Sequence, residues 1–292
     1  MRSWVTVPMV ALVGLSAGCI KTATTMHVKK DGSGTIKLEM HMSEEAMQKA
    51  AVMMAGIMAQ TMGKMTGGEG EMDMAPPPEM KMNAPKSLYD ETKARALASK
   101  FGEGVRFVKG KETTNAEGWK GFTAEYAFDD VNRITLGPDV VQGMAGMIVA
   151  QPGPAETTRE RTAYRFSMTR GAPNTLSITY PRLPDSDAEK PGTTELTVPS
   201  TTEDRVAEIM KGRRDVILVS VEGRITTTDA RWRSKRSPNT IMLYLLDYDK
   251  LLADPAARKK IEEVDNPLAL ADAKLPGLYV EQPGRLITVK FQ

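Results

Sequence analysis

Apolar and polar residues alternate along the segment from Met26 to Met42, and this period of two is typical of half-buried β-strands. The apolar residues occupy even positions on both sides of the sequence DGSG, which predicts a β-hairpin. If one face of both strands is buried, paired positions add to an even number and the loop contains an odd number of residues. We expect Gly34 to adopt the left-handed conformation of a bulge, in a register that places His27 opposite Glu39.

A helix is predicted directly after this hairpin. Ser43 precedes two glutamates and a long stretch without proline, which is the pattern of a capped helix start. Residues at helical spacing form a stripe that we expect to pack on the sheet, namely Met47, Ala51, Met54, Met58, Thr61 and Met65. Residues 63–86 are rich in Met, Pro and Gly and have no periodicity, which predicts a mobile loop.

The rest of the chain continues this combination of hairpins and helices. A helix is expected at residues 87–101, and two hairpins follow with turns at NAEG and GAPN. Two stretches lack periodicity and are interpreted as loops, residues 137–158 and the polar residues 182–200. The pattern then predicts a helix near 203–211, a strongly apolar strand pair at 215–228 and 239–248, short helices within 249–273 and a last strand at 284–291.

Together these elements predict an α+β fold, with antiparallel β-hairpins in an extended sheet and several packed helices. Strands arranged in hairpins, instead of alternating singly with helices, argue against a βαβ design. A hairpin followed by a helix recurs near both ends of the chain. We therefore expect a folded body at 19–292 with two subdomains, 19–181 and 201–292.

Residues 1–18 have the layout of a signal peptide. Arg2 precedes an apolar run that is too short to span a bilayer, and the run ends in the small residues Ser16, Ala17 and Gly18. The single cysteine of the chain, Cys19, follows at once. The segment resembles a bacterial lipobox, in which the cysteine is acylated, for example with palmitate, and becomes the new amino terminus. Two alternatives stay open, an ordinary residue in an uncleaved anchor and half of an intermolecular disulfide.

Cys19, the strand that follows it, the DGSG turn and the helix capped by Ser43 together resemble the LppM-like group of bacterial envelope lipoproteins. The resemblance implies a membrane-tethered α+β module of the cell envelope, without catalytic residues. Members often add a carboxy-terminal transmembrane helix, whereas the closing segment GRLITVKFQ is too short and too polar to span a bilayer. Ile20 stands where Asp would favour the inner membrane, so we expect an outer-membrane or periplasm-facing location.

Charge and composition weigh against several classes of function. Lys and Arg number 39 against 37 Asp and Glu, so the chain lacks the basic excess of a nucleic-acid-binding protein. One cysteine and two histidines supply no disulfide framework and little material for zinc sites or catalytic triads, so we expect no enzyme. His27, Glu39 and His41 share the polar face of the first hairpin, where an imidazole and a carboxylate suit general-base chemistry. A solvated face without function is the simpler interpretation.

The methionines are the most distinctive group with chemical character. Of the 20 in the chain, many fall between Met40 and Met82. Thioether sulfur is a soft ligand that suits Cu(I). The candidate copper ligands lie in or beside the loop at 63–86 and are Met65, Met72, Met74, Met80 and Met82. The alternative is that the helical methionines fill the core and the loop methionines belong to a linker of biased composition.

A basic segment, RWRSKRSP, occupies residues 231–238 at the predicted tip of the late hairpin. Its four cations, Arg231, Arg233, Lys235 and Arg236, would each gain about 1 kcal/mol beside an anionic membrane surface. The alternative is a solvated turn whose charges prevent strands of other molecules from pairing with the sheet.

Two functional hypotheses follow. The favoured one is a membrane-anchored envelope lipoprotein, held by lipid on Cys19, that acts as a non-enzymatic binding or scaffold module for an envelope protein or polymer. It needs no cofactor beyond the covalent lipid. The alternative is a periplasmic lipoprotein that binds or buffers Cu(I) with the methionine-rich loop.

Overall fold

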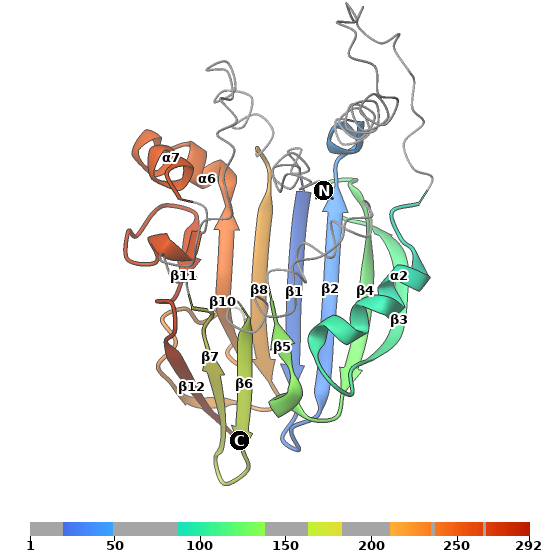
Figure 1. The fold of residues 1–292 in the computed structure, drawn as a ribbon, viewed down its shortest axis with the longest axis vertical. Coiled ribbons are helices and arrows are strands. Elements are labelled where there is room, and N and C mark those ends of the chain that lie inside the picture. The colour runs from blue at the N-terminus through green and yellow to red at the C-terminus, as the bar shows by residue number, and fades with distance from the viewer. Residues whose placement is uncertain (1–19, 49–86, 138–162, 183–210, 235–236, 265–266) are drawn as a thin grey trace, which may run out of the picture.

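Two β-sheets face each other across the hydrophobic core (Figure 1). The computed structural model describes residues 20–48, 87–137, 163–182, 211–234, 237–264 and 267–292. Sheet A has seven strands in the order β11-β10-β8-β1-β2-β4-β3, and sheet C has five in the order β5-β6-β7-β12-β9. Nearly all neighbouring strands pair antiparallel, so the predicted α+β class and its hairpins are confirmed. The strands divide between two sheets, where one extended sheet was expected.

Sheet A is built around two hairpins and one long-range pairing. The hairpins join β1 (Ile20–Val28) to β2 (Gly34–Met42) and β3 (Arg106–Thr114) to β4 (Lys120–Phe128). Strand β8 (Arg214–Val221) pairs with β1 in parallel and with β10 (Thr240–Asp247) antiparallel, and β11 (Leu278–Val280) forms one edge. Every second residue of β1 is buried, as expected for a strand with one face on the core.

Sheet C covers part of sheet A (Figure 1). It contains β5 (Thr135–Leu136), β6 (Tyr164–Thr169), β7 (Asn174–Thr179), β9 (Ile225–Thr228) and β12 (Leu286–Phe291). The predicted hairpin across GAPN is confirmed as β6 and β7. Apolar residues from both sheets belong to one buried cluster, which includes Met26, Leu38, Phe166, Ile178 and Val289.

Helix α2 (Glu91–Leu97) continues as a 3₁₀ turn, η2 (Ala98–Phe101), and covers the end of sheet A that sheet C leaves open (Figure 1). The predicted helix began at residue 87. It begins instead after Asp90, whose carboxylate accepts a hydrogen bond from the Lys93 N–H (3.1 Å). The Tyr126 hydroxyl donates to the Ala94 carbonyl oxygen (2.9 Å), which fastens α2 to β4.

A second, smaller core lies beyond β10. Helices α6 (Tyr248–Leu252) and α7 (Pro255–Glu262) and the turn η5 (Pro267–Leu270) pack there with β11, as the sequence predicted for 249–273. A further 3₁₀ turn, η3 (Val131–Arg133), lies between β4 and β5. No helix within the described ranges is long and apolar enough to cross a membrane.

The first hairpin has the predicted face but a different register. Paired positions add to an even number and the loop 29–33 has an odd length, as expected. His27 lies opposite Thr35, however, and Glu39 lies opposite Ala23, so the predicted pairing of His27 with Glu39 is wrong. The left-handed residue is Gly32 (φ 83°), because the Asp31 carboxylate accepts hydrogen bonds from the Ser33 N–H and hydroxyl and tightens the turn there.

Gly34 has a different role from the predicted one. It begins β2 in ordinary strand geometry, and a β-carbon placed on it would lie 2.0 Å from the His27 carbonyl oxygen and 2.5 Å from the Phe128 ring. Glycine is therefore needed at this position because backbone and ring approach it closely, and not because of a positive φ.

The late strands also differ from expectation. The segment 215–228 was predicted as one strand, but Gly223 (φ 84°) breaks it. The first part is β8 in sheet A and the second is β9 in sheet C. The predicted pairing of 215–221 with 240–247 is confirmed. Each sheet takes strands from both 19–181 and 201–292, since β1 pairs with β8 and β7 pairs with β12.

The helix after Ser43 starts as predicted. The Ser43 hydroxyl accepts a hydrogen bond from the Ala46 N–H (3.1 Å), and Met47 is buried in the main core. The rest of the predicted stripe, the loop 63–86, residues 183–200 of the second loop and the helix near 203–210 lie outside the described residues, as does most of 137–158.

Candidate functional site

Most of the site residues predicted from the sequence lie outside the described residues. These are Cys19, the five loop methionines (Met65, Met72, Met74, Met80 and Met82), Lys235 and Arg236. Two of the four cations of the basic segment are described, Arg231 and Arg233. Arg231 and Arg233 have different environments, and only Arg233 lies alongside a strand of sheet A.

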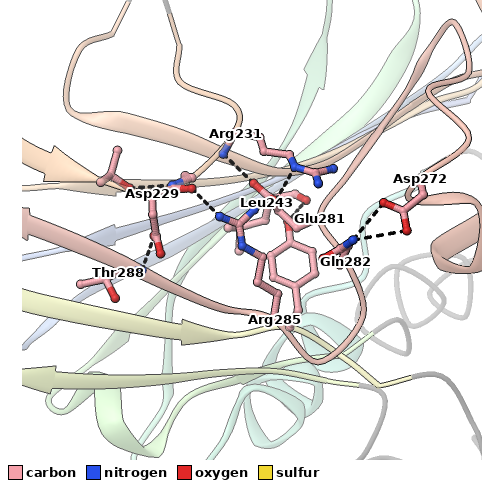
Figure 2. A network of polar contacts seen from close by, with 11 residues as sticks. Asp229, Arg231, Leu243, Asp272, Glu281, Gln282, Arg285 and Thr288 are labelled. Carbon is pink, nitrogen blue, oxygen red and sulfur yellow. Dashed lines mark hydrogen bonds and ion pairs between the residues drawn. The ribbon is translucent and has the colours of Figure 1, made fainter.

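Arg231 belongs to a polar cluster around a fully buried carboxylate (Figure 2). Its backbone N–H donates to Oε1 of Glu281 (2.6 Å), and its Nε lies 3.5 Å from Oε2. Arg285 contacts the same carboxylate from the other side and donates a second hydrogen bond to the Asp229 carbonyl oxygen (2.7 Å). Glu281 has no exposed surface, so these donors replace the water that its charge would otherwise bind.

The cluster lies where the chain crosses between the sheets. Residues 229–234 lead from β9 in sheet C to β10 in sheet A, and residues 281–285 lead from β11 in sheet A to β12 in sheet C. Asp229 also accepts a hydrogen bond from the Thr288 N–H (2.7 Å). Ion pairs and hydrogen bonds therefore hold two crossovers of opposite direction together, which is a structural arrangement rather than a reaction centre.

Tyr180 extends this connection into the core. Its hydroxyl donates to the Leu243 carbonyl oxygen of β10, and its N–H donates to the Arg285 carbonyl oxygen (2.9 Å). Its ring packs edge-on against Tyr164, with 4.9 Å between the centroids. Burial raises the pKa of the Tyr180 hydroxyl well above its usual range, so it stays a neutral donor at any physiological pH.

Arg233 lies beside the start of β10. It forms a bridge with Ile241, and its guanidinium donates to the Pro238 carbonyl oxygen (3.1 Å). The start of β10 is level with the end of β1, because Thr240 lies opposite Ser220 and Ser220 lies opposite His27. Arg233 itself lies opposite Ile241, which is level with Val219 and Met26, so it is about 20 Å along the strands from Ile20.

His27 has a neighbour that the sequence did not suggest. Its Nδ1 lies 3.0 Å from the Ser220 Oγ, a residue 193 positions later, because β1 and β8 pair in parallel. The Ser220 hydroxyl donates to the Met26 carbonyl oxygen (3.3 Å). In the tautomer that carries a proton on Nδ1, the imidazole donates to the Ser220 oxygen. That polarity is the reverse of an activated nucleophile, in which the serine donates to the imidazole.

His41 lies at the other end of the same face. Its Nε2 is 3.0 Å from the Thr113 hydroxyl of β3. Desolvation lowers the pKa of the His41 imidazole below its ordinary value of 6.5, and the opposing attraction of Glu39 does not restore it. The structure therefore keeps the two histidines apart, each beside a hydroxyl group.

A second buried carboxylate lies at the start of β8. Asp215 accepts hydrogen bonds from the Thr22 hydroxyl (2.7 Å) and from Nε of Arg213 (2.8 Å). Burial alone would lower the pKa of Arg213, but the attraction of Asp215 outweighs it and the pKa is raised. The hydrogen bond between Thr22 of β1 and Asp215 of β8 fixes the parallel register of these two strands near Ile20.

Four of the methionines, Met26, Met40, Met42 and Met47, are buried in the main core and act as packing residues. Within the described part of the chain, no three His, Cys, Asp or Glu side chains gather in a way that could hold a metal ion.

Sequence reasoning missed Glu281, Arg285, Asp215 and Ser220. Glu281 and Asp215 each have one partner within four residues, but Arg231, Thr22 and His27 lie 50 to 193 residues from the residues that they contact and reach them only through the fold. The local signals were the short spacings of Glu281 with Arg285 and of Arg213 with Asp215, and each of these spacings is equally typical of an exposed ion pair.

Comparisons with known proteins add little to this description of the site. No family model matches the chain, and no curated protein matches it. Among solved structures, the chain is similar to the folded domain of LppM from Mycobacterium tuberculosis, determined by NMR, with 8% sequence identity and a TM-score of 0.28. The match covers 100% of this chain and 95% of that domain. At that score the likeness carries no argument about function.

Proposed function

We propose that this protein is a cell-envelope lipoprotein, held to a membrane by lipid on Cys19, whose folded body is a non-enzymatic binding or scaffold module. The sequence layout at 1–19 supports the anchor, because small residues precede a single cysteine at the end of a short apolar run. Two acyl chains hold a protein firmly, whereas a single chain binds membranes only marginally.

One structural observation carries the proposal. Strand β1 begins at Ile20, the residue directly after Cys19. An acylated Cys19 would thus be joined to a central strand of sheet A without a spacer. A tether of this kind fixes which end of the sheet faces the membrane, and it leaves the rest of the body projecting away from the surface.

The face of sheet A turned away from sheet C supports a binding role. Its strands carry polar and charged side chains at alternate positions, including the pairs Lys37–Glu39 (2.7 Å) and Lys109–Glu125 (3.1 Å). Charge pairs this exposed contribute little to stability, about 0 to 1 kcal/mol, so they are free to exchange partners at a contact with a protein or polymer.

The anchor is tested by acylation. In a bacterial host fed labelled palmitate, the wild-type chain should incorporate label and sediment with membranes. Cys19→Ala should lose both properties, because the thiol is the acceptor. Label that persists in Cys19→Ala, or a variant that stays in the membrane fraction, would overturn the proposal.

The binding role is tested by crosslinking in cells. A photoreactive residue at Lys37 probes the outer face of sheet A, and one at the exposed Lys290 of β12 is the matched control on sheet C. A defined crosslinked product from position 37 and none from position 290 is expected. Equal labelling at both positions would mean that this face has no dedicated partner.

A further inference from the structure

The turn between β3 and β4 lies at the end of sheet A where β1 begins (Figure 1). Ile20 pairs with Met42, and Met42 pairs with Lys120. Two strand spacings therefore separate Ile20 from Lys120, about 10 Å. Consecutive α-carbons are about 3.8 Å apart, so Cys19 is close to this turn whatever its own conformation.

The turn is rigid and presents an aromatic side chain. The Asn115 carboxamide oxygen accepts hydrogen bonds from the backbone N–H of Glu117 (3.0 Å) and of Trp119 (2.9 Å). The Asn115 N–H donates to the Trp119 carbonyl oxygen (3.0 Å) and closes the loop. Trp119 is half-buried, so part of its indole is exposed at this end of the sheet.

Cations lie close to Trp119, although the exposed Glu44 and Glu45 follow Met42 at the same end of the sheet. The Lys21 ammonium lies 4.5 Å from the centre of the Trp119 ring and 2.5 Å from the Glu117 carboxylate. That pairing neutralises the carboxylate of the turn. Lys120 and Arg214, which flank the same end of the sheet, are exposed. A half-exposed tryptophan beside lysine and arginine is the combination that sits at the level of phospholipid headgroups.

We propose that Trp119 and Lys120 insert into the phospholipid headgroup layer when Cys19 is acylated, so that sheet A stands on the membrane with this end down. The inference rests on the proposed lipid anchor. Ile20 and Lys120 are level along the strands, because both pair with Met42, so a lipid on Cys19 would hold the turn within the depth of the headgroup layer, which is about 5 to 8 Å in each leaflet. The lipid supplies the affinity, and the turn sets the orientation.

The test uses tryptophan fluorescence in the acylated protein. Cleavage before Cys19 removes Trp4 and leaves Trp119 and Trp232. Trp232 is the matched control, because its carbonyl accepts a hydrogen bond from Met242, which is level with Leu218 and Thr25. That position is about 17 Å along the strands from Ile20. Its buried indole N–H has no hydrogen-bond partner, so Trp232→Phe loses no hydrogen bond.

Wild-type, Trp232→Phe and Trp119→Phe proteins are acylated in cells, purified and placed in vesicles whose phospholipids carry bromine next to the headgroup. We expect brominated lipid to quench most of the fluorescence of Trp232→Phe, which reports Trp119, and to leave Trp119→Phe unchanged. Equal quenching of the two variants, or none in either, overturns the orientation.

The two proposals fail in distinguishable ways. If labelled palmitate still enters Cys19→Ala, or never enters the wild-type chain, the anchor itself is wrong. If Cys19 is acylated and Trp119 is not quenched, the anchor stands and only the contact of the turn with the headgroups is wrong. Circular dichroism of each variant confirms that the sheets are intact.

Discussion

Arg285 lies four residues after Glu281, and its guanidinium contacts a carboxylate that has no exposed surface at all. The two residues flank the turn that carries the chain from β11 to β12, from one sheet to the other. Arg231 approaches the same carboxylate from the opposite crossover. We therefore expect the ion pairs that Glu281 forms with Arg231 and Arg285 to contribute to the free energy of unfolding by holding the two sheets together.

Removal of Arg285 should be costly. Arg285→Met keeps most of the side-chain volume but leaves Glu281 buried with one guanidinium fewer, and uncompensated buried charge costs about 3 to 5 kcal/mol. The free energy of unfolding in urea measures the loss. Arg106→Met is the control, since its pair with Asp129 is exposed on both sides and is worth about 0 to 1 kcal/mol. Similar losses in the two variants would contradict a special role for the buried pair.

The hydroxyl of Tyr180 should contribute measurably to the joining of the sheets. Tyr180→Phe removes one hydrogen bond and leaves the Leu243 carbonyl oxygen without that donor, at a cost of about 1 to 3 kcal/mol. Tyr89→Phe is the matched control, because the Tyr89 hydroxyl is buried and has no hydrogen-bond partner. We expect Tyr89→Phe to leave the urea midpoint unchanged or raise it. A loss in Tyr89→Phe as large as in Tyr180→Phe would refute the assignment.

His41 should make the fold sensitive to mild acid. Its pKa is lower in the folded chain than the ordinary 6.5, so the unfolded chain binds more protons in the window between the two pKa values. Stability contributed by neutral His41 is therefore present above pH 6.5 and is lost as pH falls through the folded pKa. His41→Gln retains a partner for Thr113 and cannot titrate. The difference in unfolding free energy between wild type and His41→Gln should shrink or change sign from pH 7.5 to pH 5, whereas a constant difference would exclude this contribution.

The methionine-rich loop yields a separate hypothesis. If Met65, Met72, Met74, Met80 and Met82 bind Cu(I), titration under reducing conditions should show binding that releases no protons, because thioethers carry none. Changing all five to Leu keeps the bulk and removes the sulfur. Zinc and magnesium should not compete, since they prefer nitrogen and oxygen ligands. Equal Cu(I) binding by the wild-type chain and the five-leucine variant would leave the loop as a linker.

The alternation of apolar residues predicted the strands and their hairpin partners well, but the register of the first hairpin and the long-range pairings poorly. Even positions from Met26 to Met42 identified the buried face of β1 and β2, because that pattern depends only on neighbouring residues. The register depended on which glycine turned left-handed, and the hydrogen bonds of Asp31 placed it at Gly32. The register of β1 with β8 has no local signal, because it is fixed by contacts such as Thr22 with Asp215 across the sheet.

The basic segment also shows what local sequence patterns could not predict. Arg231 and Arg233 are two positions apart and look alike in the sequence, yet one holds a buried carboxylate and the other lies along an edge of β10. The difference arises from Glu281, which directly follows β11, a strand that the sequence pattern did not reveal, and which the fold brings to Arg231. Whether a charged side chain is a surface group or a core group is decided by that distant partner.

The parallel pairing of β1 with β8 also sets the order in which the protein can be completed. Strand β1, the first described strand to be synthesised, has one neighbour nearby and another that follows 193 residues later. Until then one edge of the β1–β2 hairpin is unpaired, and contacts of such long range are slow to form. The incomplete sheet is therefore exposed to aggregation until β8, in the carboxy-terminal third of the chain, has been synthesised and has paired with β1.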